Sequence, residues 1–280
     1  MRRGRNRIVR VGRRLAPGAL ALLLALAAKP IRSDPALAAA QTTDRFDTVV
    51  IDAGHGGDDL GAQGPTGVVE KELVLDVARR LKRRLEREGL RVVLTRFNDA
   101  FVPLEQRTAI ANDARGDLFL SIHANGARAR SARGVETFFL SLEASDDAAH
   151  QLARSENAAF GAAAIAASSG DDPLVSILGD MIANEQMLES DEFARIAQRE
   201  VAALDRAPSR GVKQAPFVVL MGVQMPASLV EIGFLTNPDD ERALRGPERR
   251  EHIAEALGRA VREFGGRYDA RRGVQRRGAR

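Results

Sequence analysis

The sequence predicts an α/β domain: a mostly parallel, twisted sheet flanked by helices, with a helical insertion. Two observations predict this class. Short apolar runs of strand length alternate with longer segments whose apolar residues recur at spacings of three and four. Several of these runs are apolar on both faces, which is typical of parallel strands covered by helices on each side. A strand–helix–strand order then implies right-handed parallel crossovers.

The first forty residues differ in character from the rest of the chain. Residues 1–14 are densely positive, and the apolar run at 18–28 is too short to span a bilayer as a helix. Small residues at 36–40 offer cleavage sites. We therefore expect a signal peptide over residues 1–40 and a secreted protein, periplasmic or associated with the cell wall, with no integral membrane span after cleavage. An uncleaved anchor is the alternative, and Arg13-Arg14 leaves twin-arginine export open beside ordinary secretion.

The formal net charge of +4 is unevenly distributed along the 280 residues. Residues 1–40 hold nine basic residues and one acidic residue, which leaves 33 of the 42 basic and 37 of the 38 acidic residues for the remainder. The other basic cluster is the Arg-rich tail at 267–280, which we expect to be disordered. No basic stripe in the body is needed to explain the charge, so no nucleic-acid partner is expected. Because the chain has no cysteine, histidines and carboxylates must supply any demanding chemistry.

The body, residues 41–266, is expected to form one catalytic domain. Helices are predicted from Glu70 to Gly89, from Pro103 to Gly116, after the cap at Asn237, and near the end of the domain, where apolar residues share one face up to Phe264 and fraying is expected beyond Gly265. The predicted strands cover residues 48–51, 90–95, 118–123, 134–140, 217–220 and 227–232.

Residues 143–206 are Ala-rich, acidic and helical in pattern, and we interpret them as an insertion of about two helices. An amphipathic stripe runs through this segment. Such a stripe ordinarily packs against a core, although it also suits a partner protein. The stripe consists of Leu174, Ile177, Leu178, Met181 and Ile182, continued by Met187 and Leu188.

Two of the four histidines, His55 and His123, and the carboxylate of Glu231 lie at or near the ends of three separate apolar strands. The carboxyl ends of parallel strands meet at one edge of a sheet, and Glu70 begins a helix near the same edge. Two imidazoles and a carboxylate can hold a catalytic zinc ion, and a second carboxylate can act as general base and acid. The sequence thus predicts metal-assisted amide hydrolysis. A helix-terminal role for Glu70 stays open, and His150 and His252 are predicted to be solvated.

Four ordered stretches, which together span most of residues 46–265, resemble the zinc-dependent N-acetylmuramoyl-L-alanine amidases of the type-3 class. They are the segments at 51–57, 70–72, 121–125 and 229–237. The resemblance implies that His55, Glu70 and His123 bind one Zn²⁺ per chain and that Glu231 is the catalytic carboxylate. The implied substrate is peptidoglycan, cut at the amide between N-acetylmuramic acid and L-alanine.

The resemblance has further implications. Arg107 and Asn112 match a family helix in which they look structural, whereas Met221 stands where many relatives carry Lys or Arg. Relatives that separate daughter cells carry a helical insertion that plugs the active site until an activator protein withdraws it. The resemblance therefore implies an autoinhibited enzyme, with the stripe as activator docking site and Glu156 or Glu185 capping the zinc. The alternatives are a non-catalytic peptidoglycan-binding module and a zinc peptidase that cuts within the stem peptide.

Overall fold

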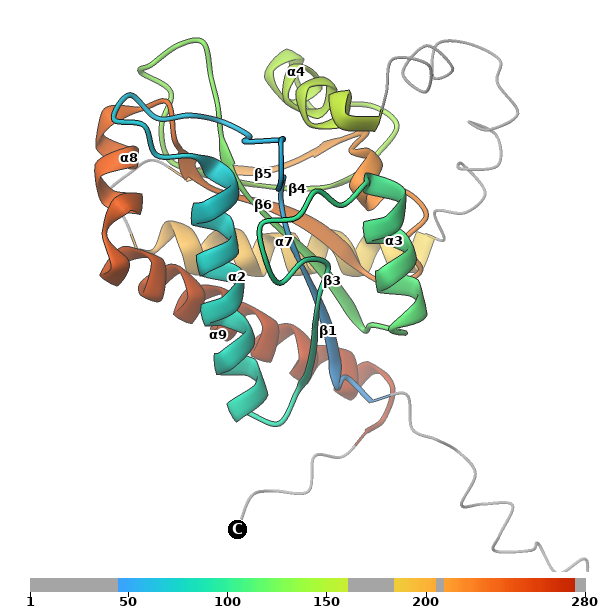
Figure 1. Cartoon of the computed structure of the whole chain (residues 1–280). Helices are drawn as coiled ribbons and strands as arrows, with labels where there is room; N and C mark the ends of the chain where they lie inside the picture. The colour runs from blue at the N-terminus through green and yellow to red at the C-terminus, as the bar shows by residue number, and fades with distance from the viewer. Residues whose placement is uncertain (1–44, 161–183, 205–208, 275–280) are drawn as a thin grey trace, which may run out of the picture. The chain divides into compact units, whose positions relative to one another are not determined.

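The computed structural model describes residues 45–160, 184–204 and 209–274. Its centre is a six-stranded sheet in the order β2-β1-β3-β6-β4-β5 (Figure 1). Only the β4–β6 pair is antiparallel among the described strands, so the predicted mostly parallel sheet is confirmed. The strands are β1 (Thr48–Ala53), β2 (Arg91–Leu94), β3 (Leu118–Asn125), β4 (Val135–Leu140), β5 (Ser209–Ala215) and β6 (Ala227–Phe234).

The register of the central strands places three buried polar residues in one row. His123 of β3 pairs with Glu231 of β6, and Glu231 pairs in turn with Glu136 of β4. Directly paired residues point to the same side of a sheet. The β3–β6 register shifts between His123 and Asn125, the kind of irregularity that ends a ladder beside a functional site.

One face of the sheet is covered by α2 (Glu70–Arg87), α7 (Asn184–Ala202) and α9 (Pro247–Arg271). The core between these layers is apolar, and its aromatic rings meet edge to face: Phe264 lies 5.8 Å from Phe46 and 5.5 Å from Phe193, centroid to centroid. Such edge-on pairs are favoured by the ring quadrupole. The shorter α8 (Pro238–Arg245) begins as predicted, with the Asn237 side chain accepting hydrogen bonds from Asp239 N and Asp240 N.

The opposite face carries a smaller apolar cluster beneath α3 (Leu104–Asp113), α4 (Asp147–Glu156) and two short 3₁₀ segments, η1 (Asn157–Phe160) and η2 (Val218–Leu220). Phe138 of β4 and Phe217 pack edge to face at 5.0 Å. This cluster stops short of the carboxyl ends of β1, β3 and β6, where the side chains on this face become polar.

The strand predicted at residues 217–220 is wrong. Val218–Leu220 form η2, and Phe217 directly before it is buried with Leu220 in the smaller core. The sixth strand is instead β5, at an edge of the sheet. Its sequence of mixed polarity lacks the apolar run by which the other strands were recognised.

The predicted fraying beyond Gly265, and the disordered tail predicted from residue 267, are wrong for residues 266–271, which continue α9. The Phe46 ring packs against Gly265 so closely that a Cβ there would lie 2.5 Å from its Cδ1. Asp269 is buried and accepts a hydrogen bond from Phe46 N at 2.8 Å. A long-range contact to the start of the domain therefore extends the helix. Residues 275–280 lie outside the described residues.

The segment predicted as a helical insertion is not uniform. Its first part, α4 and η1, lies over the smaller core, whereas α7 packs in the main core through Phe193, Ile196 and Val201. Gln198 also accepts a hydrogen bond from the Thr137 hydroxyl on β4. Thus residues 184–202 belong to the sheet domain, and any insertion ends before them.

Other sequence predictions fall outside the described residues. They include the leader and the stripe residues Leu174, Ile177, Leu178, Met181 and Ile182. At the described end of the stripe, Leu188 is 66% exposed. Among the described helices, none combines the length and the apolar character needed to cross a membrane.

Candidate metal centre

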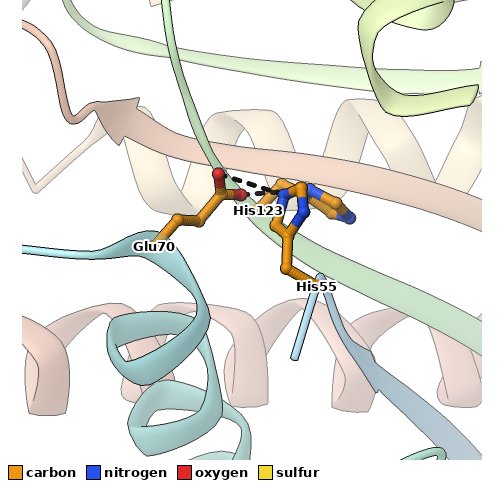
Figure 2. Close-up of side chains that lie close together, drawn as sticks. All are labelled: His55, Glu70 and His123. Atoms are coloured by element: carbon orange, nitrogen blue, oxygen red, sulfur yellow. Dashed lines mark ion pairs between the residues drawn. The ribbon is translucent and has the colours of Figure 1, made fainter. Parts of the chain in front are cut away.

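His55, Glu70 and His123 come together at the carboxyl edge of the sheet (Figure 2). His55 follows the end of β1, Glu70 is the first residue of α2, and His123 lies near the end of β3. The Glu70 carboxylate lies between the rings, with Oε2 3.1 Å from His55 Nε2 and Oε1 3.1 Å from His123 Nδ1. The structure therefore brings together the three residues that the sequence analysis grouped as metal ligands.

Two glycines permit this close approach. A Cβ on Gly54 would lie 2.4 Å from the His123 ring, and a Cβ on Gly61 would lie 2.6 Å from both Glu70 Oε2 and the His55 ring. Real Cβ atoms do not approach other atoms so closely, so any larger residue at either position would displace the rings. Gly54 and Gly61 thus leave the space in which the site residues pack.

Asp59 orients His55. Its Oδ2 lies 2.9 Å from His55 Nδ1, which leaves Nε2 to face the other two site residues. A carboxylate on the second ring nitrogen is the usual way in which proteins orient a metal-binding histidine. Sequence analysis missed Asp59, although a carboxylate four residues after the histidine in the same turn is a signal that could have revealed it.

Backbone donors fix Glu70 on both sides. Its Oε1 accepts from Ala124 N and its Oε2 accepts from Ala62 N, each at 2.8 Å. Burial raises the pKa of the Glu70 carboxyl, but His55 and His123 outweigh burial and lower the pKa. Because Glu70 contacts both imidazoles, a favourable interaction with the helix dipole does not by itself explain its position.

Glu231 is fully buried on β6, and neither of its carboxylate oxygens has a hydrogen-bond partner among the described residues. Burial raises its pKa well above the usual range, and the carboxylates of Glu70, Glu156 and Glu136 add to this effect against the opposing influence of His123. A buried carboxylate without partners is costly and therefore indicates a functional group.

Glu156, the last residue of α4, reaches into the same site. Its Oε2 lies 3.2 Å from His123 Nδ1 and 3.4 Å from His55 Nε2. The side-chain oxygens and nitrogens of His123, Glu156 and Glu231 form a second group that could hold a metal ion. Glu185 is exposed and lines a different pocket, with Arg115 and Tyr268. Of the two candidate capping residues, only Glu156 lies at the site.

The two imidazoles carry a strong preference for positive charge in this arrangement. Burial alone lowers the pKa of His55, but Glu70 and Asp59 raise it to about 9. The pKa of His123 is likewise raised well above its usual value, because Glu156 and Glu70 outweigh burial. The cluster of carboxylates thus favours a cation at this point, whether a proton or a metal ion.

The residues present fit a zinc ion. His55 Nε2, His123 Nδ1 and both Glu231 oxygens are buried, and within the described part of the chain they make no hydrogen bond of good geometry, although the ion-pair distances are short. Two imidazole nitrogens and a carboxylate oxygen are a common donor set for catalytic zinc. Buried nitrogen and oxygen atoms without hydrogen-bond partners are expected where a metal ion and a water molecule would bind.

The remaining sequence predictions are readily placed. His150 and His252 are exposed, as predicted. Asn112 bridges α3 to the turn before β6, donating to Gly222 O and accepting from Gln224 N. Met221 also lies near this turn and lines a separate apolar pocket with Leu142.

Comparison with known proteins gives a consistent result. The profile of the Amidase_3 family, described as N-acetylmuramoyl-L-alanine amidase, matches residues 49–263. The amidase AmiA of Escherichia coli K12 is 37% identical over 214 residues, which are 76% of this chain and 74% of that protein. The amidase AmiC of Escherichia coli O6:H1 is 34% identical over 223 residues, which are 79% of this chain but only 53% of that protein. The chain thus spans about half the length of one relative and three quarters of the other.

Solved structures agree in fold. An N-acetylmuramoyl-L-alanine amidase from Clostridium difficile 630 matches with a TM-score of 0.60 and 27% identity, over 79% of this chain and 97% of that one. The amidase AmiC2 of Nostoc punctiforme matches with a TM-score of 0.58 and 28% identity, over 78% and 97% of the two chains. The chain therefore belongs to the N-acetylmuramoyl-L-alanine amidase family, and its fold and class of enzyme are those that the sequence motifs predict.

Proposed function

We propose that this protein hydrolyses, with one bound Zn²⁺, the amide between N-acetylmuramic acid and L-alanine in peptidoglycan, for cell-wall remodelling or daughter-cell separation. The observation that carries the proposal is the convergence of His55, Glu70 and His123 beside Glu231, whose buried carboxylate lacks a partner among the described residues. In this proposal the first three residues bind the metal and Glu231 is the catalytic carboxylate.

A bound zinc ion supplies a Lewis acid that polarises the substrate carbonyl and makes water more acidic. The residues of the chain do the rest. Glu231 accepts the proton of the attacking water and returns it to the leaving nitrogen, for which its unpartnered oxygens are free. Asp59 keeps His55 in the orientation that presents Nε2.

The proposal is tested on labelled peptidoglycan. Without chelator, the protein should release stem peptides that begin with L-alanine and leave glycan strands intact, as read by mass spectrometry. Activity should disappear with chelator and return with Zn²⁺. Fragments cut within the stem would indicate a zinc peptidase instead. Binding without any zinc-dependent release would indicate a non-catalytic peptidoglycan-binding module.

We also propose that the enzyme is autoinhibited by α4. This helix carries Glu156 to the two imidazoles, where it occupies space that a substrate carbonyl and water would need. Three apolar residues of α4, Ala149, Leu152 and Ala153, are buried in the smaller core. Withdrawal of α4 would thus expose both the proposed metal ligands and an apolar surface. An activator protein would have to offset the free energy lost when this surface is exposed to water.

Polar contacts anchor both ends of α4. At its start, Lys213 Nζ lies 3.2 Å from Asp146 and 3.1 Å from Glu136. At its end, the Asn157 side chain donates to Pro216 O and accepts from Val218 N, each at 2.8 Å. These contacts support a helix that is held over the site at both of its ends by polar side chains, which can exchange their partners for water.

Autoinhibition is tested by Glu156→Gln, which removes the charge from the site and keeps the shape. Loss of a charge-assisted contact worth about 1.5–3 kcal/mol should raise basal activity on the order of 10- to 100-fold. Glu143→Gln, at an exposed position before α4, is the matched control. Basal activity that stays at the wild-type level in a folded, zinc-loaded Glu156→Gln protein would contradict autoinhibition.

Deletion is a poorer test than substitution. Removing about residues 145–190 would take away the first turns of α7, where Gln186 donates to Val223 O and Met225 O and Ser190 accepts from Ala227 N. These contacts hold the start of β6, which carries Glu231. A deletion must therefore end before Asn184.

Export and an activator complete the proposed function. The positive residues at 1–14 and the apolar run at 18–28 support secretion to the periplasm or the cell wall. The stripe at Leu174, Ile177, Leu178, Met181 and Ile182 is the proposed docking site of the activator, on the grounds of sequence pattern alone.

A further inference from the structure

The backbone leaves the sheet directly before His55, and its carbonyl groups then lose their strand partners. Gly54 N still donates to Ile122 O of β3, the last contact of this ladder. His55 adopts φ 60°, the left-handed region that non-glycine residues rarely occupy. A strained residue of this kind persists only where its surroundings hold it.

Two buried arginines bind these carbonyls. Arg107 Nη1 donates to Ala53 O at 2.7 Å and its Nη2 donates to His55 O at 2.8 Å. Arg96 Nε donates to Ala53 O at 2.9 Å and its Nη2 donates to Gly54 O at 2.7 Å. Both residues are 2% exposed. Three successive carbonyls, ending at the histidine itself, are therefore fixed by two guanidinium groups.

Further contacts tie the arginines to the rest of the site. Arg96 Nη2 also donates to Lys71 O in the first turn of α2, next to Glu70. Arg107 Nη1 lies 2.8 Å from Asp52, whose carboxylate accepts from the Thr95 and Ser121 hydroxyls as well. Through these bonds the positions of β1, α2 and β3, which carry the three candidate ligands, are set relative to one another.

This arrangement is costly. Burial lowers the pKa of Arg96 to about 10, and the nearby positive charge of Arg107 contributes to the shift. The buried carboxylate of Asp52 pairs with Arg107 and offsets the charge of Arg96 in part. Two positive charges would by themselves repel a metal ion, so charge does not account for their placement. The rigid arrangement of N–H donors in arginine accounts for their placement, because a guanidinium binds two carbonyls at once and an ammonium group does so poorly.

We propose that Arg107 and Arg96 are positioning residues: they hold the backbone at 53–55 so that His55 Nε2 faces the metal, and they thereby set the metal affinity of the site. This inference rests on the proposed zinc site. It gives Arg107 a role beyond the structural one that the sequence comparison implied.

The test uses Arg107→Lys and Arg96→Lys, which keep the charge and lose the rigid arrangement of N–H donors. The Zn²⁺ dissociation constant of each metal-free protein is measured by competition with a chromophoric chelator, and its melting temperature is recorded without metal. Arg80→Lys is the control, because Arg80 bridges Asp76 and Glu251 between α2 and α9, away from the site. Loss of a residue that orients a metal ligand costs about 10- to 100-fold in metal affinity.

We expect both site variants to bind Zn²⁺ about 10- to 100-fold more weakly than the control, with the larger loss at Arg107, which contacts the histidine's own carbonyl. If circular dichroism shows that Arg107→Lys does not fold, Arg96→Lys decides, because Arg96 also binds Gly54 O and Lys71 O, which Arg107 does not contact. A folded variant with a lowered melting temperature and wild-type zinc affinity overturns the inference. Absence of zinc binding by the wild-type protein overturns the proposed metal centre, and the positioning role with it.

Discussion

The two faces of the sheet differ in the side chains that they bury: one face buries almost only apolar residues, and the other also buries polar and charged ones. Beneath α2, α7 and α9 the side chains are almost all apolar and lie in one continuous core. On the opposite face the apolar cluster is smaller, and beyond it lie Asp52, His123, Glu231 and Glu136, one from each of four strands and all buried. Because side chains alternate along a strand, the same strands supply both. Stability thus resides mainly on one face and chemistry on the other, and the two can be perturbed separately.

The largest expected effect lies on the polar face. Glu231→Gln should reduce amidase activity about 10²- to 10⁴-fold, the usual contribution of a general acid or base. The metal-free protein should not lose stability, because neither oxygen has a hydrogen bond to lose among the described residues. Dye release from labelled peptidoglycan and thermal unfolding measure the two effects.

The matched control for Glu231→Gln is Glu241→Gln. Glu241 is also buried, but it accepts hydrogen bonds from Thr66 N and Thr66 Oγ1. This control should lose stability and keep activity. Full activity in Glu231→Gln would remove the carboxylate from the mechanism.

On the apolar face, Phe264→Ala should lower the free energy of unfolding by about 3–5 kcal/mol, because it leaves a cavity among Phe46, Phe193 and Tyr268. Activity per folded molecule should stay near the wild-type value. Urea denaturation and activity at low temperature check the two statements. Phe97→Ala, at a side chain 73% exposed, is the control. Equal losses of stability from both substitutions would contradict the assignment of the core.

Asp52→Asn tests whether a residue on the polar face also contributes to the stability of the fold. Breaking its pair with Arg107 should cost about 3–5 kcal/mol at neutral pH, since a buried cation is left unpaired. Burial raises the pKa of Asp52, but Arg107 and two hydroxyl donors lower it below 3.8 overall. The ionised carboxylate therefore stabilises the protein above that value, and this contribution is lost as the pH falls through the lowered pKa.

Thermal unfolding as a function of pH measures this effect. Melting temperatures of the wild-type and Asp52→Asn proteins should differ most near pH 7 and converge as the solution is acidified below about pH 4. A difference that is constant across this range would show that the charge on Asp52 contributes nothing.

The smallest effect is expected at the start of α4. Lys213→Met removes the cation between Asp146 and Glu136 and keeps the length of the side chain. A partly exposed pair contributes about 0.2–1 kcal/mol, so basal activity should rise only up to about fivefold if α4 opens more readily. Lys82→Met, which removes a pair with Glu86 on the other face, should leave basal activity unchanged. Dye release measures basal activity. Equal activities of the two variants would show that Lys213 does not help to hold α4 over the site.

Local pattern was enough to predict much of the domain. Continuous apolar runs identified β1, β3 and β6, and periodic spacing with a glycine stop identified α2. Because parallel strands end at one edge, the grouping of His55, Glu70, His123 and Glu231 followed from the positions of these residues along the chain. The family that these motifs resemble is the family whose profile matches residues 49–263.

What only the tertiary structure decided depends on contacts between distant segments. The edge strand β5 has no apolar run, α7 joined the core rather than an insertion, and α9 continued past Gly265 because Phe46 packs there. The choice of Glu156 over Glu185, the contact of Asp59 with His55, and the hydrogen bonds from Arg96 and Arg107 to the backbone at 53–55 also appeared only in three dimensions. The periodicity of a segment reports which of its faces is apolar; it does not report which distant residue will lie opposite.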